Sequence, residues 1–226
     1  MVLKALTLDL DDTLWPSAPA IAAAEAKLHA WLEREAPRVA TALPPPEFMR
    51  FRRSLMAELA PIAHDFTALR HEALRRAMTL HGHDPILADA AMELFLAARS
   101  EVELFPDVLD ALERLSKRYQ LIALTNGNAD IHRAGVGRFF TCAINPREAG
   151  MAKPDPRIFH AACSRVTALA GEVMHVGDDP ELDVRAAARA GLRAAWMNRG
   201  KVAWNGEPGP HAEYHDLLML CEALGA

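Results

Sequence analysis

The stretch that decides the fold is residues 1–15, MVLKALTLDLDDTLW. Within it, residues 2–10 form a short apolar run rich in leucine, which ends abruptly in Asp11, Asp12 and Thr13. This pattern predicts a buried strand of a parallel sheet that delivers polar groups at its carboxyl end. Open α/β sheets bind their ligands at that end of the strands. The stretch therefore predicts an α/β fold with a functional site directly after the first strand.

The character of the sequence then changes. From about residue 18 to residue 99, alanine, leucine, glutamate and arginine recur at helical spacing, interrupted at 44–46, at Pro61 and at 82–85. These features predict four helices and no strand. Because the strands of a parallel sheet must lie together, we expect this helical block to be an insertion and not a sequential domain.

Beyond residue 105 the pattern predicts strands and helices in alternation. Strands are expected over 120–125, 142–145, 173–176 and 193–197, and helices over 108–118, after Asn128, and over 155–166, 180–190 and 216–224. This alternation predicts a Rossmann-like parallel sheet of about five strands flanked by helices. We expect residues 1–15 and 103–226 to form this α/β core, and residues 16–102 to form an inserted helical cap domain.

Composition excludes several classes of protein. The 226 residues are 51% apolar, which is enough for a sizeable core. The formal charge is −5 and no long basic run occurs, so the electrostatic footprint of a nucleic-acid binder is missing. The three cysteines lack CxxC spacing, and no run approaches about 18 uninterrupted apolar residues. We expect a cytoplasmic protein that binds neither nucleic acid nor membrane; the sequence does not specify its oligomeric state.

Two carboxylates end the first predicted strand. Asp9 and Asp11 are two residues apart, so an extended chain points both side chains the same way. Both can stay ionised only if a cation such as Mg²⁺ neutralises them; otherwise one keeps its proton and can act as an acid. Either state suits phosphoryl transfer. The alternative is that residues 11–13 form only a polar turn.

Polar groups also follow the next predicted strands. Thr125 and Asn126 precede Gly127, an arrangement that can hold phosphoryl oxygens through O–H and N–H donors, although an ordinary Asn-Gly turn is the alternative. Lys153 lies in a loop before a helix. It can supply the fixed cation that clustered carboxylates and a phosphate dianion need, or it can be a solvated surface lysine.

A third group of carboxylates follows the strand at 173–176. Asp179 suits a helix N-cap and needs no functional role to explain it. Asp178 and Asp183 are harder to explain, because they add negative charge to a sheet edge that already carries Asp9 and Asp11. Such a cluster is costly without a metal ion.

These motifs resemble those of the haloacid dehalogenase-like hydrolase superfamily. The segments at 9–14 (DLDDTL), 125–127 (TNG), 153–154 (KP) and 177–179 (GDD), with Asp183, occur in that superfamily's order, and the resemblance extends over essentially the whole chain. The predicted insertion is similar to the superfamily's helical cap. More narrowly, 8–14, 125–129 and 175–179 resemble the branch that contains bacterial FMN phosphatases, which also act on a riboflavin-pathway phosphate ester.

The resemblance implies a chemical role for each core residue. Asp9 would attack phosphorus and become an aspartyl-phosphate, and Asp11 would protonate the leaving alkoxide and later deprotonate the attacking water. Thr125 and the Asn126 backbone would hold the phosphoryl oxygens. Lys153 would neutralise charge on those oxygens and orient Asp9.

The same resemblance implies Mg²⁺ as cofactor. Asp9, the carbonyl of Asp11 and Asp178 would bind the ion, and Asp183 would lie behind these ligands. Spacing alone does not decide whether Asp179 or Asp183 makes an additional contact to the metal.

Asp11 also bears on the choice among related activities. Dehalogenases of the superfamily lack an acid at the corresponding position, because a halide leaving group needs no proton. The resemblance therefore implies a phosphatase that acts on a small-molecule phosphate ester, with FMN or a related riboflavin-pathway phosphate as the leading substrate. A phosphomutase, a dehalogenase-type hydrolase and a non-catalytic phosphometabolite-binding relative are the alternatives.

Few residues of the predicted cap are candidates for substrate contact. Trp15 could stack on an aromatic leaving group or simply pack the hinge. His64, Asp65 and Arg70 resemble a segment of the flavin-phosphate branch and could touch substrate, although a solvated helix start capped by Asp65 is an equally good account. The remaining conspicuous histidines, among them His175, are predicted to be ordinary surface or packing residues.

Overall fold

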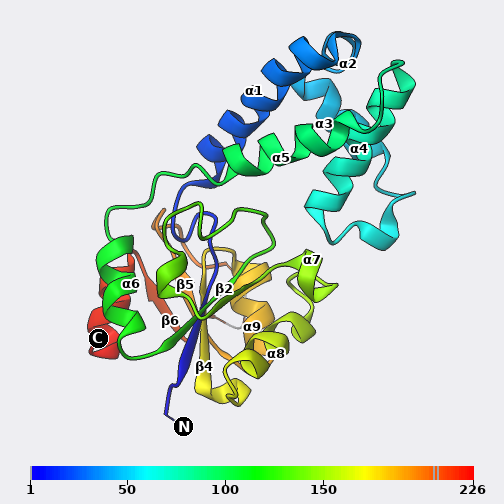
Figure 1. The fold of residues 1–226 in the computed structure, drawn as a ribbon. Coiled ribbons are helices and arrows are strands. Elements are labelled where there is room, and N and C mark those ends of the chain that lie inside the picture. The colour runs from blue at the N-terminus through cyan, green and yellow to red at the C-terminus, as the bar shows by residue number, and fades with distance from the viewer. Residues whose placement is uncertain (1, 206, 208) are drawn as a thin grey trace.

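The computed structural model describes residues 2–205, 207 and 209–226. A bundle of helices lies beyond the carboxyl ends of a helix-flanked sheet (Figure 1). The chain forms the first strand, passes into the helical bundle and then returns to complete the sheet. The helical block is therefore inserted between the first and second strands, as expected from the sequence.

All six strands of the sheet are parallel, in the order β3-β2-β1-β4-β5-β6. Their bounds are β1 (Ala5–Leu8), β2 (Gln120–Leu124), β3 (Cys142–Ile144), β4 (Val173–Gly177), β5 (Arg193–Met197) and β6 (Ala212–Tyr214). The Rossmann-like parallel sheet is confirmed. The predicted number of about five strands is one too few, because β6 has three residues, AEY, and no apolar run to mark it.

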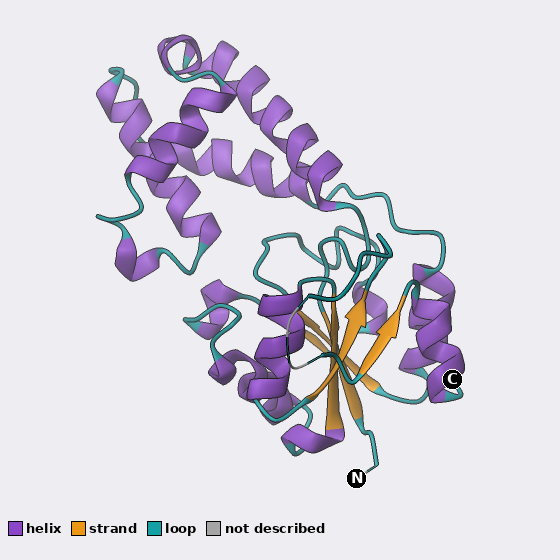
Figure 2. Cartoon of the chain, turned by 180° about the vertical axis from the view of Figure 1, so that it is seen from behind, coloured by secondary structure: helices purple, strands orange, loops and turns teal. Residues whose placement is uncertain are grey.

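Both faces of the sheet are buried, which explains the uninterrupted apolar run of the first strand. In β1, Leu6 and Leu8 pack in the core cluster that includes α6 (Val108–Ser116) and α10 (Leu217–Leu224). Ala5 lies in the opposite cluster with α8 (Pro156–Arg165) and α9 (Ala186–Arg189). Figure 2 shows helices on both sides of the strands.

Strand β1 is central, and this position decides where the site forms. Leu8 pairs in register with Ala123 of β2 on one side and with Val176 of β4 on the other. The chain adds β2 and β3 on one side of β1 and then crosses to add β4, β5 and β6 on the other. Such a switch point opens a crevice at the carboxyl ends of the neighbouring strands.

The helical bundle has an apolar core of its own, which includes Leu28, Leu74, Met78 and Phe95. Its elements are α1 (Ser17–Glu35), α2 (Pro37–Ala42), α3 (Pro45–Ser54), the 3-10 turn η1 (Ala60–Ile62), α4 (Phe66–Leu80) and α5 (Leu87–Arg99). The prediction of four helices is wrong, because the first expected helix is divided into two, α1 and α2. Pro37 has no N–H to continue α1, and it occupies the first turn of α2 instead.

The prediction of a short helix after Asn128 is also wrong. The chain runs there through turns into the 3-10 turn η2 (Gly137–Phe139). The carboxylate of Asp130 accepts the N–H groups of His132 and Arg133, and Gly135 has a left-handed backbone with φ +79°. A left-handed residue at this point ends a helical turn.

The remaining elements are short. They are α7 (Pro146–Ala149), η3 (Ala170–Glu172) and the π-helical segment η4 (Pro180–Arg185), which continues into α9. No helix among the described residues has the length and apolar character needed to cross a membrane. The three cysteines are free thiols.

Candidate active site

The residues predicted from the strand ends converge on one cavity of about 510 Å³ between the helical bundle and the sheet edge. The predicted core residues that line it are Asp9, Asp11, Thr125, Asn126, Lys153, Asp178, Asp179 and Asp183. They come from the segments after β1, β2 and β4 and from the loop before α8, which meet at the switch point of the sheet.

Lys153 is buried between two carboxylates. Its Nζ lies 2.6 Å from Asp9 Oδ1 and 2.5 Å from Asp183 Oδ1. The Asn126 amide holds the loop in place, since it donates to the Lys153 carbonyl and accepts the Lys153 N–H, both at 2.8 Å. Burial opposes the positive charge, but Asp183 and Asp9 outweigh it and hold the pKa of Lys153 above its usual range. A solvated surface lysine does not describe this residue.

Asp183 is the most heavily bonded carboxylate of the cluster. Its Oδ1 accepts from Lys153 and lies 3.0 Å from His175 Nε2, and its Oδ2 accepts the Asp179 N–H at 3.0 Å. Burial opposes its charge, but Lys153 and His175 hold the pKa of Asp183 below its usual range. Gly177 lies against it: a Cβ added there would come within 2.3 Å of Asp183 Cγ. The glycine therefore provides room for this carboxylate.

His175 links the strand interior to this cluster. The side chain is fully buried, with Nδ1 2.8 Å from Thr7 Oγ1 and Nε2 on Asp183. Because a carboxylate only accepts, Nε2 carries the hydrogen and Nδ1 accepts from the threonine hydroxyl. Burial lowers the pKa of His175 and favours the neutral ring. The sequence reading of an ordinary packing residue missed the bond to Asp183.

Three carboxylates can meet at a metal ion. Asp9, Asp178 and Asp183 each offer one oxygen, and these oxygens lie within 4.8 Å of one another. Burial and the neighbouring Asp183 and Asp12 raise the pKa of Asp178 to about 7. Burial also raises the pKa of Asp9 against the pull of Lys153. Lys153 alone does not neutralise the three carboxylates. A group of carboxylate oxygens with excess negative charge fits Mg²⁺, which prefers oxygen ligands.

Asp11 is held from both parts of the molecule. The indole N–H of Trp15 donates to Asp11 Oδ1 at 2.9 Å, and Arg99 Nη2, at the end of α5, lies 2.5 Å from both carboxylate oxygens. A Cβ on Gly127 would come within 2.6 Å of Asp11 Oδ2. Trp15 is fully buried, which matches the packing alternative. Nothing in the sequence pattern pointed to Arg99.

The other cap candidates have internal partners. Arg70 lines the cavity, but its guanidinium donates to both oxygens of Glu25, at 2.7 and 3.0 Å, and lies over the Phe95 ring. Asp65 accepts the backbone N–H groups of Thr67 and Ala68, so it caps α4. His64 is half-buried in the turn before that helix, and Asp179 caps η4 in the same way as Asp65 caps α4.

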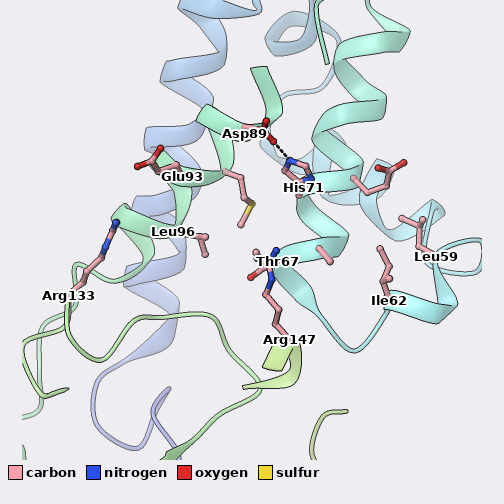
Figure 3. Close-up of a pocket in the computed structure, with 12 residues that line it drawn as sticks. Leu59, Ile62, Thr67, His71, Asp89, Glu93, Leu96, Arg133 and Arg147 are labelled. Carbon is pink, nitrogen blue, oxygen red and sulfur yellow. Dashed lines mark hydrogen bonds and ion pairs between the residues drawn. The ribbon is translucent and has the colours of Figure 1, made fainter. Parts of the chain in front are cut away.

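A second cavity, of about 660 Å³, lies between α4, α5, the loop that carries Arg133 and the short helix α7 that carries Arg147 (Figure 3). In it, His71 Nε2 lies 2.6 Å from Asp89 Oδ1. The strand-end carboxylates line the other cavity, at the sheet edge, so that cavity is the candidate active site.

Residues 3–191 match the family described as haloacid dehalogenase-like hydrolase. The chain is 30% identical to the 5-amino-6-(5-phospho-D-ribitylamino)uracil phosphatase YigB of Escherichia coli, over 98% of this chain and 96% of that protein. It is also 30% identical to the phosphoserine phosphatase of Thermus thermophilus, over 98% and 100% of the two chains. A 2-haloacid dehalogenase from Pseudomonas syringae pv. Tomato superposes with a TM-score of 0.94, at 40% identity over 99% of each chain.

Proposed function

The chain belongs to the haloacid dehalogenase-like hydrolases, and from this membership we propose that it is a Mg²⁺-dependent phosphatase of a small-metabolite phosphate monoester. The observation that carries the proposal is Asp11, which shares the cavity with Asp9. An alkoxide leaving group needs a proton donor, whereas a halide does not. The similarity to two phosphatases supports the same choice.

In this reaction Asp9 is the nucleophile. Its carboxylate attacks phosphorus, the bond from phosphorus to the ester oxygen breaks, and an aspartyl-phosphate forms on Asp9. The ion pair with Lys153 holds Asp9 in place and offsets charge on the phosphoryl oxygens. The ester oxygen leaves as an alkoxide and takes its proton from Asp11. Asp11 then accepts a proton from the water that hydrolyses the intermediate, which releases phosphate and regenerates Asp9.

The phosphoryl oxygens have two donors beside Lys153. The Thr125 hydroxyl oxygen accepts the Gly127 N–H at 2.8 Å, so the hydrogen of that hydroxyl is free to donate into the cavity. The backbone N–H of Asn126 is the second donor. Both lie at the end of β2, beside the nucleophile at the end of β1.

Asp9, Asp178 and the main-chain carbonyl of Asp11 would hold Mg²⁺. When bound, the ion neutralises carboxylate and phosphoryl charge during transfer. Asp183 supports this set through its bonds to Lys153, His175 and the Asp179 N–H. Asp183 also reaches the same cluster of oxygens, so it is a further candidate ligand.

We propose that residues 16–102 act as a cap over the core formed by 1–15 and 103–226. The separate apolar core of the bundle supports this division. So does the cavity, which has strand-end carboxylates on one side and cap residues on the other. The leading substrate is FMN or a related riboflavin-pathway phosphate, supported by the similarity to the 5-amino-6-(5-phospho-D-ribitylamino)uracil phosphatase.

Cleavage of a carbon–halogen bond is the second candidate, favoured by the similarity to a protein described as a 2-haloacid dehalogenase. In that reaction Asp9 would attack carbon and Asp11 would have no leaving group to protonate. Halide release from a 2-haloacid distinguishes it from phosphate release.

The test is phosphate release from a panel of phosphate monoesters that includes FMN, with Mg²⁺ and with EDTA, for the wild type and Asp9→Asn. We expect release that needs Mg²⁺ and is lost in Asp9→Asn, with both proteins giving the same circular dichroism spectrum. An isomeric sugar phosphate as product would indicate a mutase. Release of halide without release of phosphate, or tight ester binding with no turnover, would contradict the phosphatase.

A further inference from the structure

The cap side of the active-site cavity has an apolar wall that faces solvent. Ile21, Met49, Met56 and Phe66 line this cavity and are between 39% and 54% exposed. They come from α1, from α3 and the turn after it, and from the start of α4. Large apolar side chains that share one concavity gain burial when an apolar ligand enters it.

Two arginines of the same wall make no ion pair with the part of the chain that the structure describes. Arg52 and Arg53, both on α3, line the cavity. The other two cap arginines that line this cavity form ion pairs, Arg70 with Glu25 and Arg99 with Asp11. Within the described ranges, no carboxylate lies at ion-pair distance from Arg52 or Arg53. Glu25, the carboxylate beside Arg52, is already bound by Arg70, so two guanidinium groups share one carboxylate in this wall.

Arg52 is the more informative of the two, because it is half-buried. Burial and the neighbouring charge of Arg70 lower the pKa of its guanidinium more than the carboxylate of Glu25 raises it, yet an arginine stays protonated in a protein. A charged group that has lost water and faces a like charge is stabilised by acceptor oxygens. The planar guanidinium fork matches two coplanar oxygens best.

From this wall we propose, building on the phosphatase function, that the substrate's leaving group has an apolar, planar body and, far from the phosphate, an acceptor-rich edge that Arg52 binds. The body packs against Phe66 and the methionines of the wall while the phosphate sits at the carboxylates. The edge is a carboxylate, a second phosphate or a pair of ring carbonyls, which share the chemistry of coplanar acceptor oxygens. Phosphate esters of small aliphatic alcohols without such an edge are poor substrates.

Three aryl esters separate these features: phenyl phosphate, 4-carboxyphenyl phosphate and 4-carbamoylphenyl phosphate share the body and the phosphate and differ at the far edge. The quantity measured is the ratio of kcat/KM for each substituted ester to that for phenyl phosphate. We expect a ratio of about ten or more for the carboxyl ester in the wild type. Arg52→Gln should lower that ratio at least about fivefold.

Arg50→Gln is the matched control. Arg50 is on the same helix, largely exposed, and pairs with Glu47 outside the cavity lining. We expect its ratio to stay within about twofold of the wild type. An unchanged ratio in Arg52→Gln, or an equal fall in both variants, would overturn the proposal. If the kcat/KM ratio for the carbamoyl ester equals that for the carboxyl ester, a neutral oxygen is sufficient for binding to Arg52. If the ratio for the carbamoyl ester is near one, Arg52 requires an anionic edge.

Binding to inactive protein separates this proposal from the phosphatase function. Calorimetric titration of Asp9→Asn in Mg²⁺ should give tighter binding of 4-carboxyphenyl phosphate than of phenyl phosphate. The double variant Asp9→Asn, Arg52→Gln should lose that difference. If the wild type releases no phosphate from any ester, the phosphatase proposal fails while this contrast still decides the role of Arg52. Equal binding by the single and double variants would refute that role.

Discussion

Two glycines make room for the carboxylates that follow the strands. Gly177 lies against Asp183 and Gly127 lies against Asp11, each so close that a Cβ would overlap the carboxylate. Both glycines have backbone angles outside the left-handed region, so space and not conformation requires them. Both belong to short motifs that the sequence marked as strand ends.

Gly177→Ala should lower both activity and stability. The added Cβ would push Asp183 away from Lys153 and His175, so we expect kcat/KM to fall at least about tenfold and the free energy of unfolding in urea to fall by about 1–3 kcal/mol. Gly200→Ala is the control, since the nearest side-chain atom to its added Cβ is 3.8 Å away. Wild-type values for Gly177→Ala in both assays would contradict this account.

Arg99 should matter only where a proton must be delivered, because it acts through Asp11. We expect Arg99→Gln to reduce kcat/KM for an alkyl phosphate by about 10–100-fold, and for p-nitrophenyl phosphate, whose leaving group needs little proton donation, by less than about threefold. Asp11→Asn should give the same contrast. Equal losses on both esters in Arg99→Gln would mean that Arg99 supports the fold alone.

At the scale of elements, polar side chains and prolines begin most of the helices. α2, α3, α7 and α8 each start with proline in the first turn, a position that needs no N–H donor. In several helices a side-chain oxygen accepts hydrogen bonds from the first free backbone N–H groups. These oxygens belong to Asp65, Asn145, Asp155, Asp179 and Asp216. For Asp65 the sequence left capping and substrate contact equally open, and the bonds to the Thr67 and Ala68 N–H groups show that it caps α4.

Asp65→Ala should destabilise the cap helix that it begins. Loss of the two bonds to the Thr67 and Ala68 N–H groups should reduce the free energy of unfolding by about 1 kcal/mol, measured by urea denaturation. Asp65→Asn keeps an N-cap oxygen and should change stability by less than half of that. If Asp65→Asn lowered kcat/KM as strongly as Asp65→Ala while stability held, substrate contact would be the better account.

At the scale of the whole molecule, the sheet gathers more negative charge than the protein neutralises. Asp9 and Asp178 follow β1 and β4, Asp183 lies in η4, and Lys153 is the cation that contacts Asp9 and Asp183. The Asp178 carboxylate accepts a long bond from the Thr13 hydroxyl, at 3.4 Å. A divalent cation would relieve this excess.

The pKa of about 7 for Asp178 predicts that the affinity for Mg²⁺ depends on pH. Below pH 7 the metal-free protein holds a proton on Asp178, which the ion must displace, so affinity should fall by about tenfold per pH unit. Above pH 7 the carboxylate is already ionised and the affinity should level off. Calorimetric titration with Mg²⁺ from pH 5.5 to 8.5 (about the range that brackets this pKa) measures it.

Asp178→Asn provides the control for this titration, because it removes both the ligand charge and the proton. Its Mg²⁺ affinity should be weak and should not change through pH 7. A wild-type affinity that stays constant between pH 6 and 8 (about one unit either side of the pKa) would show that Asp178 does not compete with the metal for a proton.

The sequence by itself determined the α/β fold and the strand-end residues. A buried parallel strand appears as an apolar run, and polar residues directly after it can only lie at its carboxyl end, so Asp9, Thr125 and Asp178 were readable one strand at a time. Reading one segment at a time missed β6, because three residues are too few to show a pattern. It also missed the break between α1 and α2 at Pro37.

Only the tertiary structure decided which side chains meet. Lys153 and Asp9 are 144 residues apart, and Arg99 and Asp11 are 88 apart. Periodicity gives the face on which a side chain lies, but not the distant element that packs against that face. For the same reason the sequence could not show that Glu25 pairs with Arg70 and that Arg52 makes no ion pair with the described residues, because any acidic residue elsewhere in the chain could have reached Arg52.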